Sequence, residues 1–225
     1  MVLKDINDGL IVSCQASKKE PMFGSDIMAA MAKAAEEGGA KGIRAEGTED
    51  IKSIKSEVSL PVIGIEKNYE YESEVFITPT IKEVNKVYNA GADIIALDST
   101  IQSRPQNIKL KEIINYIREN TNLPVMADVS TFKEAKEADE LGVDLIATTL
   151  VGYTKYTQNY NPPDFNLLKN MLDKLNTPIV LEGGVRSPEE AQKALDMGAY
   201  SVVVGTAITR PQIITSWFVE AMQKA

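Results

Sequence analysis

The sequence predicts an α/β protein: a single (β/α)8 barrel forming one domain over residues 1–225. Three observations support this fold: the chain length, a phrase that recurs about every 50 residues, and eight short apolar runs that alternate with helical patterns. A chain of 225 residues lies within the range of about 200 to 250 residues in which such a barrel forms one domain. An open, doubly wound sheet is the alternative, but no glycine-rich dinucleotide fingerprint follows the first apolar run.

Four segments of similar sequence each begin with a glycine and continue as a short apolar run, and their starts lie 52, 51 and 56 residues apart. They are GAKGIRAE (39–46), GADIIALD (91–98), GVDLIATT (142–149) and GAYSVVVG (198–205). A second phrase, a proline before an apolar run, lies between them: PVIGI (61–65), PVMA (124–127) and PIVL (178–181). Such runs are typical of strands that are covered on both faces. Together with the run at 10–13 they predict eight strands, with about 25 residues for each strand and its helix.

The segments between these runs carry helical patterning, and several begin with helix start signals. Ser25 precedes an alanine-rich run, Thr131 lies three residues before Glu134, and Ser187-Pro188 is followed by two glutamates. The patterns at Thr131 and Ser187 each predict a capping box. Helices are expected at 25–38, 48–57, 80–90, 107–120, 131–141, 164–175, 188–197 and 211–223. The last of these has an apolar segment, 213–222, which we expect either to close the barrel or to lie in a second subunit.

Composition excludes several classes of function. One cysteine, Cys14, cannot form an internal disulfide, and the absence of histidine removes the most common zinc ligand and general base. We therefore expect no metal site, acid–base chemistry by Lys, Asp, Glu or Tyr, and Cys14 as a small buried apolar residue. A net charge of -8 disfavours nucleic acids and anionic membranes, so the expected partner is a small molecule. The sequence contains no signal peptide and no apolar run near the length of a membrane span, which predicts a cytoplasmic protein.

Polar residues follow each predicted strand, where a (β/α)8 barrel places its catalytic groups. They are Ser13-Cys14-Gln15, Arg44-Ala45-Glu46, Glu66-Lys67, Asp98, Asp128, Thr148-Thr149, Glu182-Gly183-Gly184 and Gly205-Thr206. One such residue indicates little, because any strand becomes polar where it leaves a core. Lys67, Asp128 and Glu182 together favour a function, because burying a lysine and two carboxylates near the barrel axis is unfavourable unless they are paired or take part in the chemistry.

Glycines follow the seventh and eighth predicted strands, where barrels commonly hold a phosphate group. Gly183-Gly184 and Gly205-Thr206 allow backbone N–H groups to approach an anion closely, and Arg210 supplies a positive charge nearby. A tight turn explains any one of these glycines equally well. Glycines in both loops favour a phosphate site.

Nine segments resemble the N-acetylmannosamine-6-phosphate 2-epimerase family over nearly the whole chain. They are GLIVSCQA (9–16), GIRAEG (42–47), PVIGIEK (61–67), ITPTIKEV (77–84), ALDST (96–100), MADVST (126–131), TTLVGYTKYT (148–157), LEGGV (181–185) and VVVGTAITRP (202–211). The resemblance implies a cofactor-free TIM barrel. It also implies an epimerase that interconverts N-acetylmannosamine 6-phosphate and N-acetylglucosamine 6-phosphate in the breakdown of sialic acids, and a homodimer.

The resemblance also implies roles for individual residues. Lys67 and Glu182 match the catalytic positions of the family, and Gln15, Arg44 and Asp128 match its sugar-contacting positions. Gly183, Gly184, Gly205 and Arg210 match its phosphate site. Tyr153, in the loop after the sixth predicted strand, either covers the sugar or packs the loop.

Inversion at C2 requires a base that removes a carbon-bound proton, and such a base must be neutral. A free lysine has a pKa near 10.4, so burial has to lower the pKa of Lys67 by about three units. Glu66 points to the opposite side of the strand, since side chains alternate. Three alternatives also fit these residues: a Schiff-base lyase that uses Lys67, a sugar-phosphate-binding protein without activity, and a structural ion pair of Lys67 with a strand-end carboxylate such as Glu182 or Asp98.

Overall fold

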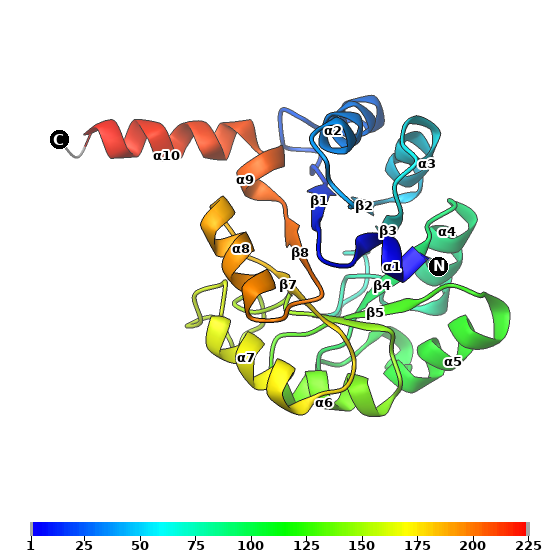
Figure 1. Cartoon of the computed structure of the whole chain (residues 1–225). Helices are drawn as coiled ribbons and strands as arrows, with labels where there is room; N and C mark the ends of the chain where they lie inside the picture. The colour runs from blue at the N-terminus through cyan, green and yellow to red at the C-terminus, as the bar shows by residue number, and fades with distance from the viewer. Residues whose placement is uncertain (1, 224–225) are drawn as a thin grey trace.

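Eight parallel strands form one closed barrel in the computed structural model, which describes residues 2–223 (Figure 1). Each strand pairs with the next in sequence, and β1 closes the ring by pairing with β8. The strands are β1 (Leu10–Cys14), β2 (Gly42–Glu46), β3 (Val62–Ile65), β4 (Ile94–Asp98), β5 (Val125–Asp128), β6 (Leu145–Ala147), β7 (Ile179–Glu182) and β8 (Ser201–Val204). This confirms the predicted barrel, and the alternative of an open sheet is wrong.

Helices cover the outside of the barrel, and every helix expected from the sequence is present within a few residues. They are α2 (Ser25–Glu37), α3 (Thr48–Glu57), α4 (Ile81–Asn89), α5 (Leu110–Asn120), α6 (Phe132–Glu140), α7 (Phe165–Lys174), α8 (Pro188–Asp196) and α10 (Pro211–Gln223). Three short helices were not expected: α1 (Val2–Ile6), α9 (Thr206–Thr209) and the 3-10 turn η1 (Pro105–Asn107). Elements of three to five residues carry too little periodicity to be recognised in a sequence.

The helices α2 and α8 begin at the expected residues, but their capping contacts differ from those predicted. At α6 the capping box of Thr131 and Glu134 is present as predicted. At α2 the helix begins at Ser25 itself, after Gly24, and the Ser25 hydroxyl donates to Asp50 on α3 at 2.6 Å. At α8 the Ser187 oxygen accepts from a backbone N–H, but the glutamate of the expected box accepts from the N–H of the residue before Ser187. The Ser25 side chain therefore bonds to a neighbouring helix and does not cap its own. At α8 only the serine half of the expected capping box is present.

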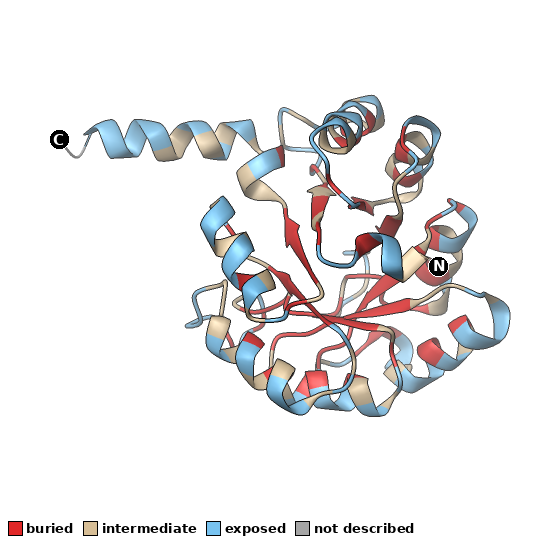
Figure 2. Cartoon of the chain, in the orientation of Figure 1, coloured by how far each residue is buried: buried red, intermediate tan, exposed pale blue. Residues whose placement is uncertain are grey.

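Apolar side chains form two separate layers, one inside the barrel and one between the barrel and its helices. The inner layer includes Ile11, Ile63, Ile94 and Val203, and Ile6 of α1 seals it at the N-terminal end of the strands. Figure 2 shows buried strands surrounded by helices that are buried on their inner faces and exposed on their outer faces. The inner layer thus supports the polar groups that lie at the opposite, C-terminal ends of the strands.

The outer layer contains Cys14, which is fully buried, as predicted for a small apolar residue. Met28 is also fully buried in this layer, and Met22 and Met31 pack against it. This layer is continuous around the barrel, since residues of every strand from β1 to β8 belong to it.

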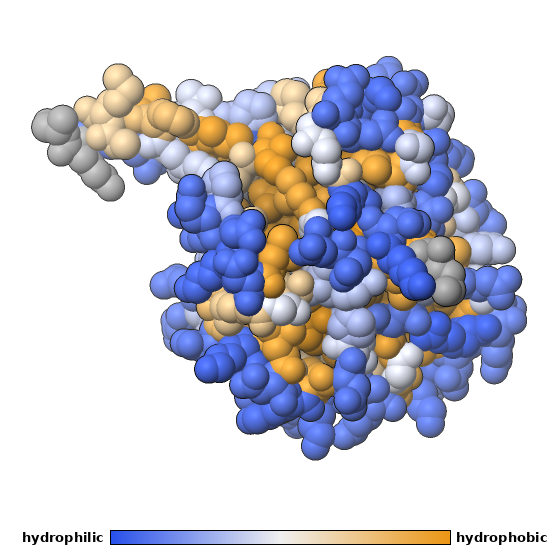
Figure 3. Space-filling view, in the orientation of Figure 1, coloured by the Kyte–Doolittle hydropathy of each residue, from blue (hydrophilic) through white to orange (hydrophobic). Residues whose placement is uncertain are grey.

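The C-terminal helix α10 leaves the barrel and extends away from it (Figure 1), so the expectation that it closes the barrel is wrong. None of its residues is buried, and Phe218 and Met222 are 68% and 78% exposed. The space-filling view shows hydrophobic atoms along α10 and at its base (Figure 3). No helix within residues 2–223 is both long and apolar enough to cross a membrane.

Candidate active site

A cavity of about 800 Å³ opens at the C-terminal ends of the strands. Ten of the eleven residues singled out in the sequence line it: Gln15, Arg44, Lys67, Tyr153, Glu182, Gly183, Gly184, Gly205, Thr206 and Arg210. Asp128, the eleventh, is fully buried and does not line the cavity. The barrel therefore brings together residues that lie up to 195 positions apart in the chain, between Gln15 and Arg210.

Arg44 on β2 joins two carboxylates at the floor of the cavity. Its Nη1 and Nη2 atoms donate to the two oxygens of Asp128 at 3.0 and 2.6 Å, and Nη1 also donates to Glu182 Oε2 at 3.0 Å. Thr149 Oγ1 donates a further hydrogen bond to Asp128 Oδ1 at 2.7 Å. Asp128 thus lies behind Arg44 and orients the guanidinium, which in turn holds Glu182 at the cavity wall.

Glu182 is the carboxylate of this group that faces the cavity. Burial raises its pKa, the Arg44 guanidinium opposes the rise, and the charge of Asp128 adds to it. Burial is the largest of these causes, and Arg44 offsets only part of it because it is shared with Asp128. A carboxyl group with a raised pKa can hold and release a proton near neutral pH.

Lys67 follows β3 and points into the same cavity. Its Nζ atom donates to Gln15 Oε1 at 2.7 Å, and Gln15 in turn donates from Nε2 to Ser13 Oγ at 2.9 Å. Burial lowers the pKa of Lys67; the charge of Glu46 opposes this shift, whereas the charges of Arg44 and Arg210 add to it. The predicted direction of the shift at Lys67 is therefore present in the structure.

The two charges that end the third strand separate as predicted. The Glu66 carboxylate accepts from Lys86 Nζ on α4 at 2.7 Å, outside the barrel. Within residues 2–223 no carboxylate lies within ion-pair distance of Lys67, because Glu182 pairs with Arg44, and Asp98 lies 3.9 Å from an arginine of its own loop. The ion-pair explanation of Lys67 is wrong.

The glycines after β7 have backbone conformations that suit glycine, with φ of 100° at Gly183 and 72° at Gly184. A Cβ atom on Gly184 would lie 2.2 Å from the Pro162 carbonyl oxygen, whereas one on Gly183 would have no neighbour closer than 3.7 Å. Gly184 is therefore also required by the close packing of the loop between β6 and α7. Arg210 also lines the cavity, and it forms an ion pair with Glu20 at 2.9 Å.

Several residues of the cavity were not proposed as site residues from the sequence. Ser13 and Thr149 were among the strand-end residues, but nothing local distinguished them from their neighbours. Arg186 and Trp217 also line the cavity, with the guanidinium 5.4 Å from the indole ring. These two residues come from the loop before α8 and from α10, and no sequence pattern connects them.

The chain matches one family over most of its length. Residues 28–224 match the family model described as "Putative N-acetylmannosamine-6-phosphate epimerase". A protein of Clostridioides difficile (strain 630) is 51% identical over 223 residues, with 99% of each chain covered. One from Caldanaerobacter subterraneus subsp. tengcongensis is 53% identical over 220 residues, covering 97% of this chain and 92% of the relative. Both relatives are named "Putative N-acetylmannosamine-6-phosphate 2-epimerase".

Solved structures agree with the sequence comparison. The structure of the N-acetylmannosamine-6-phosphate 2-epimerase from Clostridium perfringens superposes with a TM-score of 0.95 at 45% identity, over 98% of this chain and 96% of that one. A thiamine phosphate pyrophosphorylase from Pyrococcus furiosus, with a TM-score of 0.64 and 17% identity, shares the fold alone. The chain therefore belongs to the N-acetylmannosamine-6-phosphate epimerase family and is an enzyme of the isomerase class, an epimerase.

Proposed function

We propose that this enzyme inverts C2 of N-acetylmannosamine 6-phosphate to give N-acetylglucosamine 6-phosphate, with Lys67 as the group that removes and returns the proton. The observation that carries this proposal is the shared cavity, in which the buried amine of Lys67 lies with Glu182 and the glycine loops. The names of the relatives supply the substrate. We further propose that the reaction takes place in the cytoplasm and serves the breakdown of sialic acids.

The chemistry requires an uncharged amine beside an acidic C–H bond. In the open-chain sugar, C2 is bonded to the C1 carbonyl, so the Nζ lone pair can accept the C2 proton. The C–H electron pair then forms the C1–C2 double bond of an enolate, and the C1 oxygen carries the charge. Return of a proton to the opposite face of C2 gives the epimer with no net oxidation or reduction.

In this proposal Glu182 and Arg44 act on the oxygen atoms of the sugar, Glu182 by proton transfer and Arg44 by its positive charge. Glu182 has a raised pKa and supplies or accepts the proton that moves during ring opening. Arg44, held by Asp128, keeps a positive charge at the cavity floor, and positive charge stabilises a developing enolate. In this proposal Asp128 acts through Arg44, because it is shielded from the cavity.

The phosphate group of the substrate lies at the opposite end of the cavity, against Gly183, Gly184, Gly205, Thr206 and Arg210. Backbone N–H groups beside glycines approach phosphate oxygens closely, and an arginine adds a charge-assisted hydrogen bond. Arg210 now pairs with Glu20, so we propose that the phosphate takes the place of that carboxylate. Tyr153 covers the sugar from the loop after β6.

Proton NMR of N-acetylmannosamine 6-phosphate with the purified enzyme in deuterated water tests this function. We expect formation of N-acetylglucosamine 6-phosphate with deuterium at C2, and neither product nor exchange with Lys67→Met. Exchange retained by Lys67→Met would exclude Lys67 as the proton carrier. Trapping by borohydride with substrate would favour a Schiff-base lyase, and binding without product would favour a protein without activity.

We also propose that the enzyme is a homodimer in which the apolar residues of α10 are covered by a second copy. Phe218, Val219 and Met222 are 68%, 45% and 78% exposed, an unusual concentration for the end of one helix. Sedimentation velocity should give a dimer, which Phe218→Ser weakens and the control Thr215→Ser does not. A monomer at all concentrations would contradict this assembly.

A further inference from the structure

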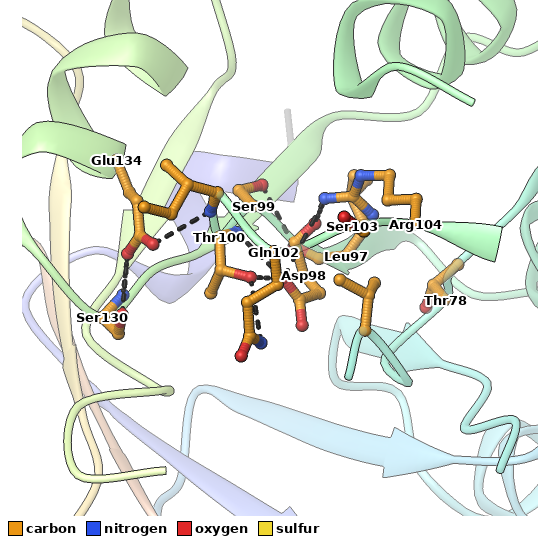
Figure 4. Close-up of polar contacts among 12 residues, drawn as sticks. Thr78, Leu97, Asp98, Ser99, Thr100, Gln102, Ser103, Arg104, Ser130 and Glu134 are labelled. Atoms are coloured by element: carbon orange, nitrogen blue, oxygen red, sulfur yellow. Dashed lines mark hydrogen bonds and ion pairs between the residues drawn. The ribbon is translucent and has the colours of Figure 1, made fainter. Parts of the chain in front are cut away.

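Glu134 on α6 is a fully buried carboxylate that accepts five hydrogen bonds. Its Oε2 atom serves the helix start alone, accepting from Ser130 N and Oγ at 2.8 Å each and from Thr131 N at 2.9 Å. Figure 4 shows Glu134 directed toward Ser130 on one side and toward the segment that follows Asp98 on the other. One oxygen is thus sufficient for the capping box.

The second oxygen, Oε1, bonds to two loops that the capping box does not involve. It accepts from the N–H of Ile101 at 3.0 Å, in the loop after β4, and from the hydroxyl of Tyr156, in the loop after β6. A carboxylate is a stronger acceptor than a neutral group, particularly in a site removed from water. Glu134 therefore ties together the three loops that leave β4, β5 and β6.

The loop after β4 is itself held firmly, so it gives Glu134 a fixed partner. Thr100 donates from N and Oγ1 to Asp98 Oδ1 at 2.9 and 2.7 Å, and Arg104 donates to the Asp98 carbonyl oxygen (Figure 4). These contacts place Ile101, the next residue after Thr100, with its N–H directed at Glu134. The Asp98 side chain is thus used to shape this loop.

The loop between β6 and α7 is the one of the three that forms a wall of the cavity. Its lining residues are Thr149, Leu150, Tyr153, Asn161, Pro162 and Pro163. Besides the Tyr156 hydroxyl, two hydrogen bonds attach it to the neighbouring loop: one from Thr154 Oγ1 to Ser130 Oγ at 3.3 Å, and one from the Leu150 N–H to the Val129 carbonyl oxygen at 3.1 Å, near the end of β6. Tyr153 itself is 70% exposed, so its position depends on how this loop is held.

We propose that Glu134 is a positioning residue for substrate binding, and that the hydroxyl of Tyr156 is the link through which it fixes the cavity-lining loop. This inference rests on the proposed function, because it assigns the loop to the sugar phosphate. Neither residue lines the cavity, and both act through the loop that carries Tyr153. Lys67 and Glu182 stand on other strands, so the loop affects binding more than proton transfer.

Tyr156→Phe, with Tyr160→Phe as the matched control, tests the link. Both tyrosines belong to the same loop, but Tyr160 is 53% exposed and does not line the cavity. We expect Tyr156→Phe to raise KM for N-acetylmannosamine 6-phosphate about tenfold and to leave kcat within about twofold. Amide hydrogen exchange of residues 150–161 should become faster in this variant, while exchange in β3 and β7 stays unchanged.

Two further variants keep the test decisive. Glu134→Gln replaces one of the two acceptor oxygens with an NH2 group and so weakens the contacts that fix the loop. It should raise KM, and its combination with Tyr156→Phe should be non-additive because both variants affect the contact between residues 134 and 156. If Tyr156→Phe does not fold, Thr154→Val replaces it, since it removes the hydrogen bond from this loop to Ser130. An equal KM in Tyr156→Phe and Tyr160→Phe, or a fall in kcat alone, would overturn the proposal. A wild-type enzyme without epimerase activity would instead overturn the proposed function.

Discussion

The side chains of Lys67 and Gln15 meet at the mouth of the barrel, where Lys67 Nζ donates to Gln15 Oε1 at 2.7 Å. Gln15 is oriented by Ser13, whose hydroxyl oxygen accepts from the other end of the amide at 2.9 Å. An amide oxygen accepts a hydrogen bond without adding a net charge, so it orients the amine while favouring its protonated form less than a carboxylate would. The Nζ lone pair then remains available for a proton from carbon.

Replacing the amide with a carboxylate should therefore move the pH dependence of catalysis. In Gln15→Glu a negative charge at the same position favours the ammonium form and raises the pKa of Lys67, whereas burial now lowers it. Less neutral amine is present at a given pH, so the acidic limb of the kcat profile should move up by about 1 to 3 units. Gln15→Met, which has no charge, is the control, and its acidic limb should stay at or below the wild-type position.

Arg44→Met should destabilise the enzyme and make its stability more sensitive to pH. The change leaves Asp128 and Glu182 buried without a cation, which costs about 3 to 5 kcal/mol of the free energy of unfolding. The pKa of Glu182, already raised by burial, rises further, so the folded state binds more protons than the unfolded state and stability falls as pH rises. Urea unfolding at several pH values measures this; a loss that is equal at acid and alkaline pH would contradict it.

Gly184→Ala should cost more stability than Gly183→Ala, although both glycines have a positive φ. A Cβ atom on Gly184 meets the Pro162 carbonyl oxygen at 2.2 Å, while one on Gly183 meets nothing closer than 3.7 Å. We expect a difference of about 1 to 3 kcal/mol in the free energy of unfolding, and a higher KM for Gly184→Ala because the loop is displaced. Similar losses in the two variants would show that backbone strain alone decides the effect.

Asp98→Asn should make stability less dependent on pH below neutrality. Burial raises the pKa of Asp98 to about 6, from an ordinary value of 3.8. The folded protein holds a proton that the unfolded chain releases between these values, so this group lowers the stability of the wild type as pH rises through them. The wild type should therefore lose up to about 3 kcal/mol more than Asp98→Asn from pH 4 to 6. A parallel pH dependence in the two proteins would show that Asp98 is ionised throughout.

Much of the candidate site was predictable because a (β/α)8 barrel places the end of every strand on one face. Once the eight apolar runs are recognised, the residues after each run are expected together, and Lys67 and Glu182 do share one cavity. The direction of Glu66 was also predictable, since it depends only on alternation along one strand. The path of α10 was not, because an apolar helix is compatible with packing on its own barrel or on another surface.

The barrel, its strand order and the face that carries the polar groups can be read from the amino-acid sequence, because they follow from short-range periodicity and from the recurrence of one unit. The contacts among the polar groups depend on the folded barrel. Arg44 reaches Asp128, 84 residues away, so that Asp128 lies behind it and outside the cavity wall. Likewise, one oxygen of Glu134 completes a local cap and the other binds two distant loops. Such contacts depend on distances across the barrel, which no local pattern in a chain encodes.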